Sequence, residues 1–307
     1  MPEPGTTAPS ADRRPLQFGV TVDPTSADPG APGRLARVAD IAGLDLVAVQ
    51  DHPYQPTFLD ALTLIATLVP QTRRIRFVTN VVSLPLRPPA MLAKAAASLD
   101  VLSGGRFELG LGAGGAPDGI ASMGGPRRTP ADSVAALEES ITVARLMWSG
   151  GTPHFAGRHY TLDGVHAGPV PPHPINIWLG AIGDRMLDLT GRAADGWLPS
   201  LPYVPPQTLP ARHARIDDAA QRAGRDPATI HRIYNLTGHI GPTGSRPLNG
   251  PVALWVDELT RFTVELGMTG YLYWPNRDHE RQIELFANEV VPAVREAVSS
   301  ARRVDGR

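Results

Sequence analysis

Short apolar runs and longer amphipathic stretches alternate along almost the whole chain. The first apolar runs lie at 17–22, 46–49, 75–79 and 107–111 and have the length of β-strands; the run at 46–49 is apolar at every position. A strand that is apolar at every position is covered on both faces, which is typical of parallel sheets. Between these runs, apolar residues recur every three or four positions, as on the buried face of a helix. One predicted helix carries Leu35, Val38, Ala39 and Ala42, and the next carries a stripe at positions 59, 62, 66 and 69.

The alternation continues to the C-terminus. A long helix is predicted over 134–148, with its start marked by Thr129 and Asp132, and a polar hairpin is predicted at 154–162. The later strands are predicted at 175–179, 196–198, 230–236 and 270–273, and the later helices at 184–193, 207–223, 252–266 and 281–299. Alternating strands and helices imply a parallel sheet with right-handed crossovers. Together with the helix predicted at 89–102, this gives eight strands and eight helices in about 300 residues, so the chain predicts an α/β fold, a (β/α)8 TIM barrel with short insertions after strand 4 and before strand 5. We expect one domain over 1–307, with 1–15 as a flexible segment.

Composition narrows the possible partners. The 29 Lys and Arg residues balance 30 Asp and Glu residues, which gives a net charge of -1 and no cationic surface of the kind that nucleic acids require. The chain has no cysteine, which excludes disulfides, thiolate zinc sites and a cysteine nucleophile. No run approaches the roughly 18 apolar residues of a membrane span. We therefore expect a cytoplasmic protein that binds neither nucleic acid nor membrane.

The loop after the second predicted strand carries the strongest catalytic candidate. Active sites of (β/α)8 barrels lie at the C-terminal ends of the strands, and here Asp51 and His52 follow the strand directly, with Pro53 behind them. Histidine exchanges protons near neutral pH, so His52 is the predicted acid or base. The alternative is a histidine that caps the next helix or only packs in the loop. Asp51 has two interpretations of equal weight, as a site residue or as an acceptor of backbone hydrogen bonds.

Glycines follow the fourth and fifth predicted strands. Gly110, Gly112 and Gly115 satisfy the spacing of a dinucleotide-binding turn, but no helix opens directly after them, so we expect instead that they let a flat ring approach the backbone. The loop at 180–185 leads into a helix whose free N–H groups suit a phosphate; the alternative is a plain turn. The histidine spacings predict no metal site, and no Gly-x-Ser-x-Gly motif supports a serine hydrolase.

Several of these segments, taken in order, resemble the luciferase-like monooxygenase superfamily. They are the Asp51–His52 pair, the segments 79–81 and 87–89, the segment 97–114 and the segment 194–197, which together extend over roughly 18–198. The aspartate–histidine pair and the short insertions are most similar to the branch that uses the deazaflavin coenzyme F420. The branch that uses flavin mononucleotide (FMN) is the close alternative.

This resemblance implies a cofactor ring that lies across the barrel mouth. A backbone bulge with a cis bond between Asn80 and Val81 would support one face of the ring, and His52 would stand over the reacting carbon. The implied cofactor contacts are the backbone of Asp51, Asn80 and Val81 in the bulge, Gly112 and Gly114 in the glycine-rich loop, Asp118 near the pyrimidine side, and Ala181, Ile182 and Gly183 near the ribityl chain or phosphate.

The resemblance also implies a reaction. The first hypothesis is an oxidoreductase that transfers a hydride between coenzyme F420 and a small organic substrate, with His52 exchanging the proton. The second is an FMN-dependent monooxygenase supplied with reduced flavin by a separate reductase, and the third is a flavin-binding relative without catalysis. Relatives that oxidise a sugar phosphate carry a glutamate where Gly115 stands, together with lysines that this chain lacks, which argues against that substrate. Small residues at 93 and 95–97 predict close helix contacts, and similar proteins dimerise through this side, so we expect a homodimer.

Overall fold

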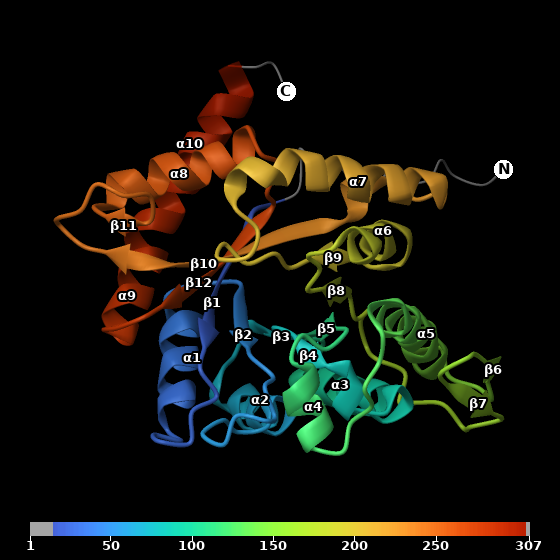
Figure 1. The fold of residues 1–307 in the computed structure, drawn as a ribbon. Coiled ribbons are helices and arrows are strands. Elements are labelled where there is room, and N and C mark those ends of the chain that lie inside the picture. Colours follow the sequence, from blue (N-terminus) through green and yellow to red (C-terminus); the bar gives the residue numbers. More distant parts are fainter. Residues whose placement is uncertain (1–14, 305–307) are drawn as a thin grey trace, which may run out of the picture.

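The computed structural model describes residues 15–304, in which eight parallel strands close into a barrel (Figure 1). The expected flexible segment 1–15 therefore lies outside the described residues except for Pro15. Around the barrel the order is β1-β2-β3-β5-β8-β9-β10-β12, and β10 closes the ring by pairing with both β9 and β12. The strands are β1 (Gln17–Val22), β2 (Leu46–Val49), β3 (Arg76–Thr79), β5 (Phe107–Gly112), β8 (Ile177–Leu179), β9 (Gly196–Trp197), β10 (His231–Ile240) and β12 (Gly270–Pro275). The predicted (β/α)8 barrel is confirmed.

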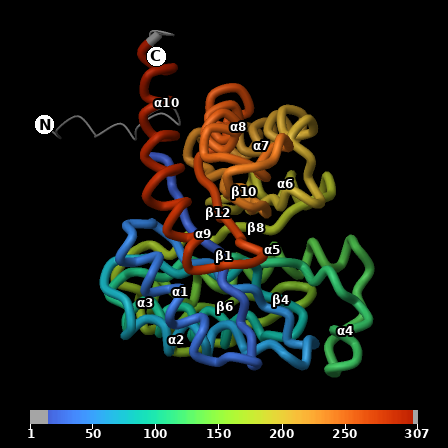
Figure 2. The backbone as a smooth tube through the Cα atoms, turned by 90° about the vertical axis from the view of Figure 1, so that its left-hand side faces the viewer, coloured from blue at the N-terminus to red at the C-terminus, as the bar shows by residue number. Residues whose placement is uncertain are grey.

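Helices follow the strands and cover the outside of the barrel. They are α1 (Ala31–Ile41), α2 (Ala61–Leu68), α3 (Pro89–Ser103), α5 (Pro130–Trp148), α6 (Asp184–Ala193), α7 (Leu209–Arg222), α8 (Val252–Val264), α9 (His279–Leu285) and α10 (Val291–Val304). Thr129 caps α5 as predicted, since its hydroxyl accepts a hydrogen bond from the Asp132 amide at 3.1 Å. The predicted last helix is interrupted by a π-helical turn at Phe286–Val290, and Figure 2 shows α10 extending away from the barrel.

Both predicted insertions are present. After β5 the chain forms a short helix, α4 (Pro117–Ser122), where the sequence predicted only a glycine-rich loop. Strand β4 (Val82–Ser83) precedes β5 in the chain and pairs with its end, and β11 (Asn249–Gly250) pairs with the end of β10. Before β8, the predicted hairpin consists of β6 (His154–Ala156) and β7 (Thr161–Asp163).

Two predictions about helix faces need correction. In α2, the buried positions include Leu64, Ile65 and Leu68, whereas Ala66 of the predicted stripe is exposed. This helix is apolar at most positions, so periodicity alone does not select its inner face. In α3, the alanines at 93, 96 and 97 are buried within the chain itself, so the close contacts predicted for them are made inside the protein, and the homodimer stays a prediction.

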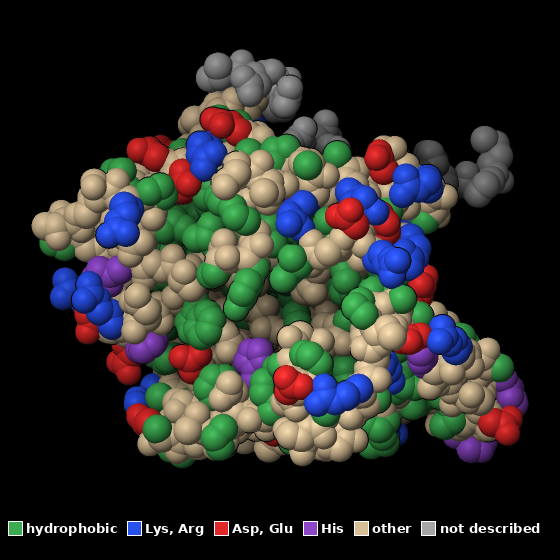
Figure 3. Space-filling view, viewed as in Figure 1, with side chains coloured by type: hydrophobic (Ala, Val, Ile, Leu, Met, Phe, Trp, Pro, Cys, Tyr) green, Lys and Arg blue, Asp and Glu red, His purple; other side chains and the backbone are tan. Residues whose placement is uncertain are grey.

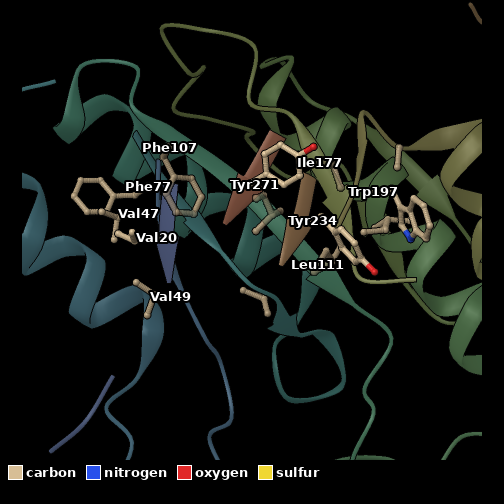
Figure 4. Close-up of a cluster of buried hydrophobic side chains, with 14 of the residues drawn as sticks. Val20, Val47, Val49, Phe77, Phe107, Leu111, Ile177, Trp197, Tyr234 and Tyr271 are labelled. Carbon is tan, nitrogen blue, oxygen red and sulfur yellow. The ribbon is translucent and has the colours of Figure 1, made fainter. Parts of the chain in front are cut away.

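The barrel separates two apolar clusters. Inside it, one buried cluster contains Leu46, Ala48, Val78, Trp178, Leu198, Ile233 and Leu272. Outside it, side chains from neighbouring strands pack against the helices: Val20 is in register with Val47, Val47 with Phe77, and Phe77 with Phe107 (Figure 4). Residues that share a register face the same side of a sheet, which assigns every second strand residue to the barrel interior.

Charged groups occupy the N-terminal end of the barrel. Arg76 donates to the buried Glu108 at 2.7 Å, and Nδ1 of His173 lies 2.7 Å from the buried carboxylate of Asp100. Glu108 and Asp100 raise the pKa of His173 to about 9 by stabilising the imidazolium. This end of the barrel is therefore built from ion pairs, and the opposite end carries the residues predicted for catalysis.

Candidate active site

The candidate site lies on the face where the strands end, which Figure 1 views from the front. In Figure 3 the centre of this face is hollowed, and hydrophobic side chains gather around the hollow while most charged side chains lie toward the rim. The site is thus a largely apolar recess at the barrel mouth, with few polar groups to orient a ligand.

Asp51 joins two loops below the recess. Its side chain is 1% exposed, and its carboxylate accepts hydrogen bonds from the Ser83 amide at 2.9 Å and from Arg87 at 2.7 and 3.2 Å. Arg87 also contacts Asp60, whose side chain caps α2. The carboxylate of Asp51 therefore fixes the loop that carries the next residue, His52, to the segment after β3. Its backbone contact with a cofactor remains a prediction.

His52 is half-buried directly after Asp51. Nδ1 of its ring lies 2.8 Å from the hydroxyl of Tyr54, and the ring of Phe58 lies 6.3 Å away. Burial lowers the pKa of His52, although the charge of Asp51 acts in the opposite direction. A lowered pKa makes the neutral imidazole the main form at pH 7, and a neutral imidazole can both donate and accept a proton.

The bulge after β3 has the predicted cis peptide bond between Asn80 and Val81. The side-chain amide of Asn80 donates to the side-chain oxygen of Asn235 at 2.6 Å, and Asn235 donates to the Pro199 carbonyl at 3.1 Å. Asn80 follows β3 and Asn235 lies on β10, four strands away in a ring of eight. This pair of amides therefore spans the mouth of the barrel from one side to the other.

Glycines make room for this bulge. A Cβ atom at Gly110 would lie 1.7 Å from the Thr79 carbonyl oxygen, and a Cβ atom at Gly112 would lie 2.7 Å from a methyl group of Val81. At Gly180, a Cβ atom would lie 3.1 Å from the same methyl group. The glycines at 110 and 112 in β5 and at 180 directly after β8 are thus required by the bulge itself, and they leave room for the side chain of Val81 against the inner cluster.

The glycine-rich segment continues into α4, which borders the recess. Gly114 has a φ of +96° and lies against Pro85 and Ile120. Asp118 has an exposed side chain that pairs with Arg127 at 2.9 Å. A Cβ atom at position 119, the next residue of α4, would lie 2.7 Å from the ring of Tyr54. Helix α4 therefore packs directly on the residue that hydrogen-bonds His52.

The turn before α6 contains the remaining predicted cofactor residues. Ala181 is buried and its carbonyl accepts a hydrogen bond from the Trp197 indole at 2.9 Å, while Ile182 is half exposed. Gly183 precedes the first residue of α6, and no side chain caps this helix. The first N–H groups of α6 are therefore available to an anion.

The family model of the luciferase-like monooxygenases matches residues 15–257, which is most of the chain. The chain belongs to this family. Among relatives of this luciferase-like chain, an uncharacterized protein of Mycobacterium tuberculosis is 30% identical over 282 residues, which cover 85% of this chain and 94% of the relative. A protein of Gordonia bronchialis named F420-dependent glucose-6-phosphate dehydrogenase is 28% identical over 266 residues, covering 83% and 75% of the two chains.

The fold is shared with solved structures. An F420-dependent secondary alcohol dehydrogenase superposes on 92% of this luciferase-like chain with a TM-score of 0.82 at 20% identity, and 99% of that chain is covered. At this identity the likeness concerns the fold. It agrees with the closed barrel described above.

Polar atoms in the mouth of the luciferase-like barrel indicate where a polar ligand would bind. Within residues 15–304, Thr21 Oγ1, one oxygen of Asp23 and Ser83 Oγ are buried without a hydrogen-bond partner. Thr21 is in register with Ala48, a residue of the inner cluster, so it faces the barrel interior. Buried polar groups without partners are rare in folded proteins, and at a recess they are typical of ligand contacts. These atoms, the bulge at Val81 and the open start of α6 fit a flat, polar, phosphorylated cofactor.

The sequence did not predict Thr21, Tyr54 or Asn235 as site residues. Tyr54 lies in the loop already selected for His52, so its closeness to His52 in the sequence was the available signal. Asn235 interrupts the apolar positions of β10 on the face that also carries Ile233, which is a signal for a polar residue inside the barrel. No comparable pattern in the sequence indicates that α4 contacts Tyr54.

Among residues 15–304, no helix is long and apolar enough to cross a membrane. In the same part of the chain, no group of three or more histidine and carboxylate side chains could hold a metal ion.

Proposed function

We propose that this protein is an oxidoreductase that transfers a hydride between coenzyme F420 and a small organic substrate, with His52 as the proton donor or acceptor. The observation that carries the proposal is the half-buried imidazole of His52, held at the barrel mouth beside Tyr54 and Phe58 and directly after Asp51, whose carboxylate is fixed by Arg87. The name of the Gordonia bronchialis relative supports coenzyme F420 as the cofactor.

The protein residues that would hold the cofactor lie on two sides of the recess. Val81 and its flanking glycines would support one face of the ring, and Asn80, fixed by Asn235, would keep the bulge in place. The N–H groups at Gly183 and at the start of α6 would bind the phosphate side. When bound, coenzyme F420 supplies the hydride chemistry, while the protein supplies binding and orientation.

His52 would exchange the proton that accompanies the hydride. A substrate carbonyl oxygen or imine nitrogen gains this proton on reduction and loses it on oxidation. The apolar surroundings of the recess favour the neutral imidazole, so His52 can act in either direction near pH 7. General acid–base groups in such positions contribute about 100- to 10,000-fold to the rate.

An absorbance titration tests the choice of cofactor. The purified protein is titrated with coenzyme F420 and, separately, with FMN, and binding of F420 at micromolar concentration is the expected result. Oxidation of the reduced deazaflavin is then followed with cyclohexanone, 1-pyrroline and cyclohex-2-enone, which represent a carbonyl, an imine and an activated double bond. Binding of FMN without binding of F420 would overturn the proposal.

His52→Ala tests the role of the imidazole. We expect turnover to fall at least about 100-fold while the dissociation constant of F420 changes little, because His52 is proposed to act on the substrate. His154→Ala is the control, since His154 lies on the exposed hairpin far from the site in the chain. Equal losses of turnover and F420 affinity in His52→Ala would limit this residue to a binding role.

A second candidate is an FMN-dependent monooxygenase that receives reduced flavin from a separate reductase, which the family name favours. The apolar recess suits this reaction too, because reduced flavin must react with oxygen away from water. Oxygen consumption that depends on the organic substrate would favour this function. Tight cofactor binding without hydride transfer to any acceptor would favour a non-catalytic relative.

Sugar phosphates are disfavoured as substrates despite the name of the Gordonia bronchialis relative. Gly115 stands where the resemblance implies a glutamate in such enzymes, and no heavy atom lies within 4 Å of a Cβ atom built there. We also propose a homodimer in the cytoplasm, with the exposed apolar residues Met91, Val101 and Leu102 of α3 at the interface. Light scattering that shows a monomer at high concentration would reject the dimer.

A further inference from the structure

We infer that Tyr54 is a positioning residue that fixes the tautomer of His52, so that proton exchange with the substrate takes place at Nε2. This inference rests on the proposed proton-transfer role of His52 and names the residue that controls it. The geometry that carries it is a contact series from α4 through Tyr54 to His52.

The first link is the hydrogen bond between Tyr54 and His52. The hydroxyl oxygen and Nδ1 are 2.8 Å apart, and within residues 15–304 Nδ1 is the ring nitrogen of His52 with a hydrogen-bond partner. The two side chains are two positions apart in one loop and their ring centroids lie 5.6 Å from each other. The ring nitrogen left to face a ligand is Nε2.

The second link is the direction of this hydrogen bond. Burial and the charge of Asp51 raise the pKa of Tyr54, so its hydroxyl keeps its proton near pH 7, and burial lowers the pKa of His52. A phenol is a stronger acid than a neutral imidazole N–H, and an imidazole nitrogen is a stronger base than a phenol oxygen. The Tyr54 hydroxyl therefore donates to Nδ1, and the proton of the neutral imidazole resides on Nε2.

The third link holds Tyr54 in place. Helix α4 lies against the tyrosine ring at Gly119, where a Cβ atom would be 2.7 Å from Cγ and 3.0 Å from Cδ2. Ile120 of α4 is buried beside Gly114 and Gly125, and these two glycines lie against Pro85 and Leu86 of the segment after β4. Only a residue without a side chain allows this approach, so Gly119 sets the position of the tyrosine.

The charged groups near the pair are few and mostly neutralised. Asp51 is paired with Arg87, and Asp118 on α4 is paired with Arg127. Asp60 completes the charged set through its contact with Arg87. These pairs leave the hydrogen bond from Tyr54 as the contact that distinguishes Nδ1 from Nε2.

The proton balance follows from this arrangement. When the substrate is reduced, the Nε2–H bond breaks and the proton forms a bond to the substrate oxygen or nitrogen, while the proton of Tyr54 passes to Nδ1. This proton then returns from Nδ1 to the Tyr54 oxygen and a solvent proton binds Nε2, which restores the starting tautomer. One proton moves from solvent to substrate, and the net charge of the protein does not change. Oxidation uses the same steps in reverse.

Nitrogen NMR of the histidine rings tests the inference on the protein without cofactor. Resonances of His52 are assigned by their loss in His52→Ala. We expect the Nε2–H tautomer in the unmodified protein and a mixture of tautomers in Tyr54→Phe. The variant should also raise the pKa of His52 by about 0.4 to 1 unit, because the lost hydrogen bond stabilises the neutral ring. Tyr203→Phe, which changes an exposed tyrosine, should leave both quantities unchanged.

Gly119→Ala provides a second variant in which the hydroxyl remains. It should shift the tautomer ratio and the pKa of His52 in the same direction as Tyr54→Phe, because the added methyl group displaces the tyrosine ring. A wild-type protein with the proton on Nδ1, or an unchanged tautomer ratio in Tyr54→Phe, would overturn the inference. These results do not depend on F420, so failure of F420 to bind would refute the proposed function separately.

Discussion

Replacement of Arg87 by methionine should strongly destabilise the protein. Asp51 is 1% exposed and Arg87 is 19% exposed, so the ion pair between them is largely shielded from water. Arg87→Met removes both guanidinium hydrogen bonds to Asp51, together with the one to Asp60, and leaves the Ser83 amide as the remaining donor to Asp51 among residues 15–304. Loss of one partner from a buried ion pair costs about 3–5 kcal/mol, because the other charge remains buried without compensation.

This magnitude is large relative to the total stability of a folded domain, which is about 5–15 kcal/mol. We expect the free energy of unfolding, measured by urea titration with tryptophan fluorescence, to fall by about 3–5 kcal/mol in Arg87→Met. The additional variant Asp51→Asn in the Arg87→Met background should recover part of this loss, because an amide is less costly to bury than an unpaired carboxylate.

The exposed ion pair between Arg127 and Asp118 provides the control. Arg127→Met should change the free energy of unfolding by less than about 1 kcal/mol, since both side chains are mostly in water. A loss in Arg87→Met no larger than the loss in Arg127→Met would refute the argument from burial. Failure of Asp51→Asn to recover any stability would refute the argument from the uncompensated carboxylate.

Two further predictions concern the glycines and the charged end of the barrel. Gly112→Ala should lower the free energy of unfolding by about 1–3 kcal/mol, because its methyl group would meet Val81. Gly115→Ala should change the free energy of unfolding little, since no heavy atom lies within 4 Å of its Cβ position. Similar thermal midpoints of the two variants would contradict this prediction. His173 has a folded pKa of about 9 against an ordinary value of 6.5, so its contribution to stability is complete below pH 6.5 and is lost as the pH rises through about 9. Between pH 6 and pH 9.5, the free energy of unfolding should fall by at most about 3 kcal/mol in the unmodified protein and by much less in His173→Asn. An equal fall in both proteins would show that His173 is not the group responsible.

The order of elements could be predicted from the sequence because strands that are buried on both faces are short and apolar throughout. The run at 46–49 is an example, and the structure buries all four of its residues. The inner face of α2 could not be predicted, since most of its positions are apolar. Helix α4 was missed because glycines surround it, although Pro117 occupies its first position, where proline is favourable.

The candidate site was predicted in part. His52 and the cis bond at Asn80 were placed by their position after strands and by the resemblance to a family. Asn235 could not be paired with Asn80 from the sequence, because the two residues are 155 positions apart and meet only when the barrel closes. The contact between Gly119 and Tyr54 could not be predicted either, because it depends on how the insertion that contains α4 packs against the loop after β2.

The amide pair of Asn80 and Asn235 has a kinetic consequence. It crosses the barrel above a packed interior in which Leu46, Val78 and Leu272 are fully buried, so the recess has a closed bottom. In the proposed function a cofactor and a substrate share this recess, so both would pass through the same opening, and the one that binds deeper would have to arrive first and depart last. For the proposed oxidoreductase, steady-state measurements should therefore follow a compulsory binding order.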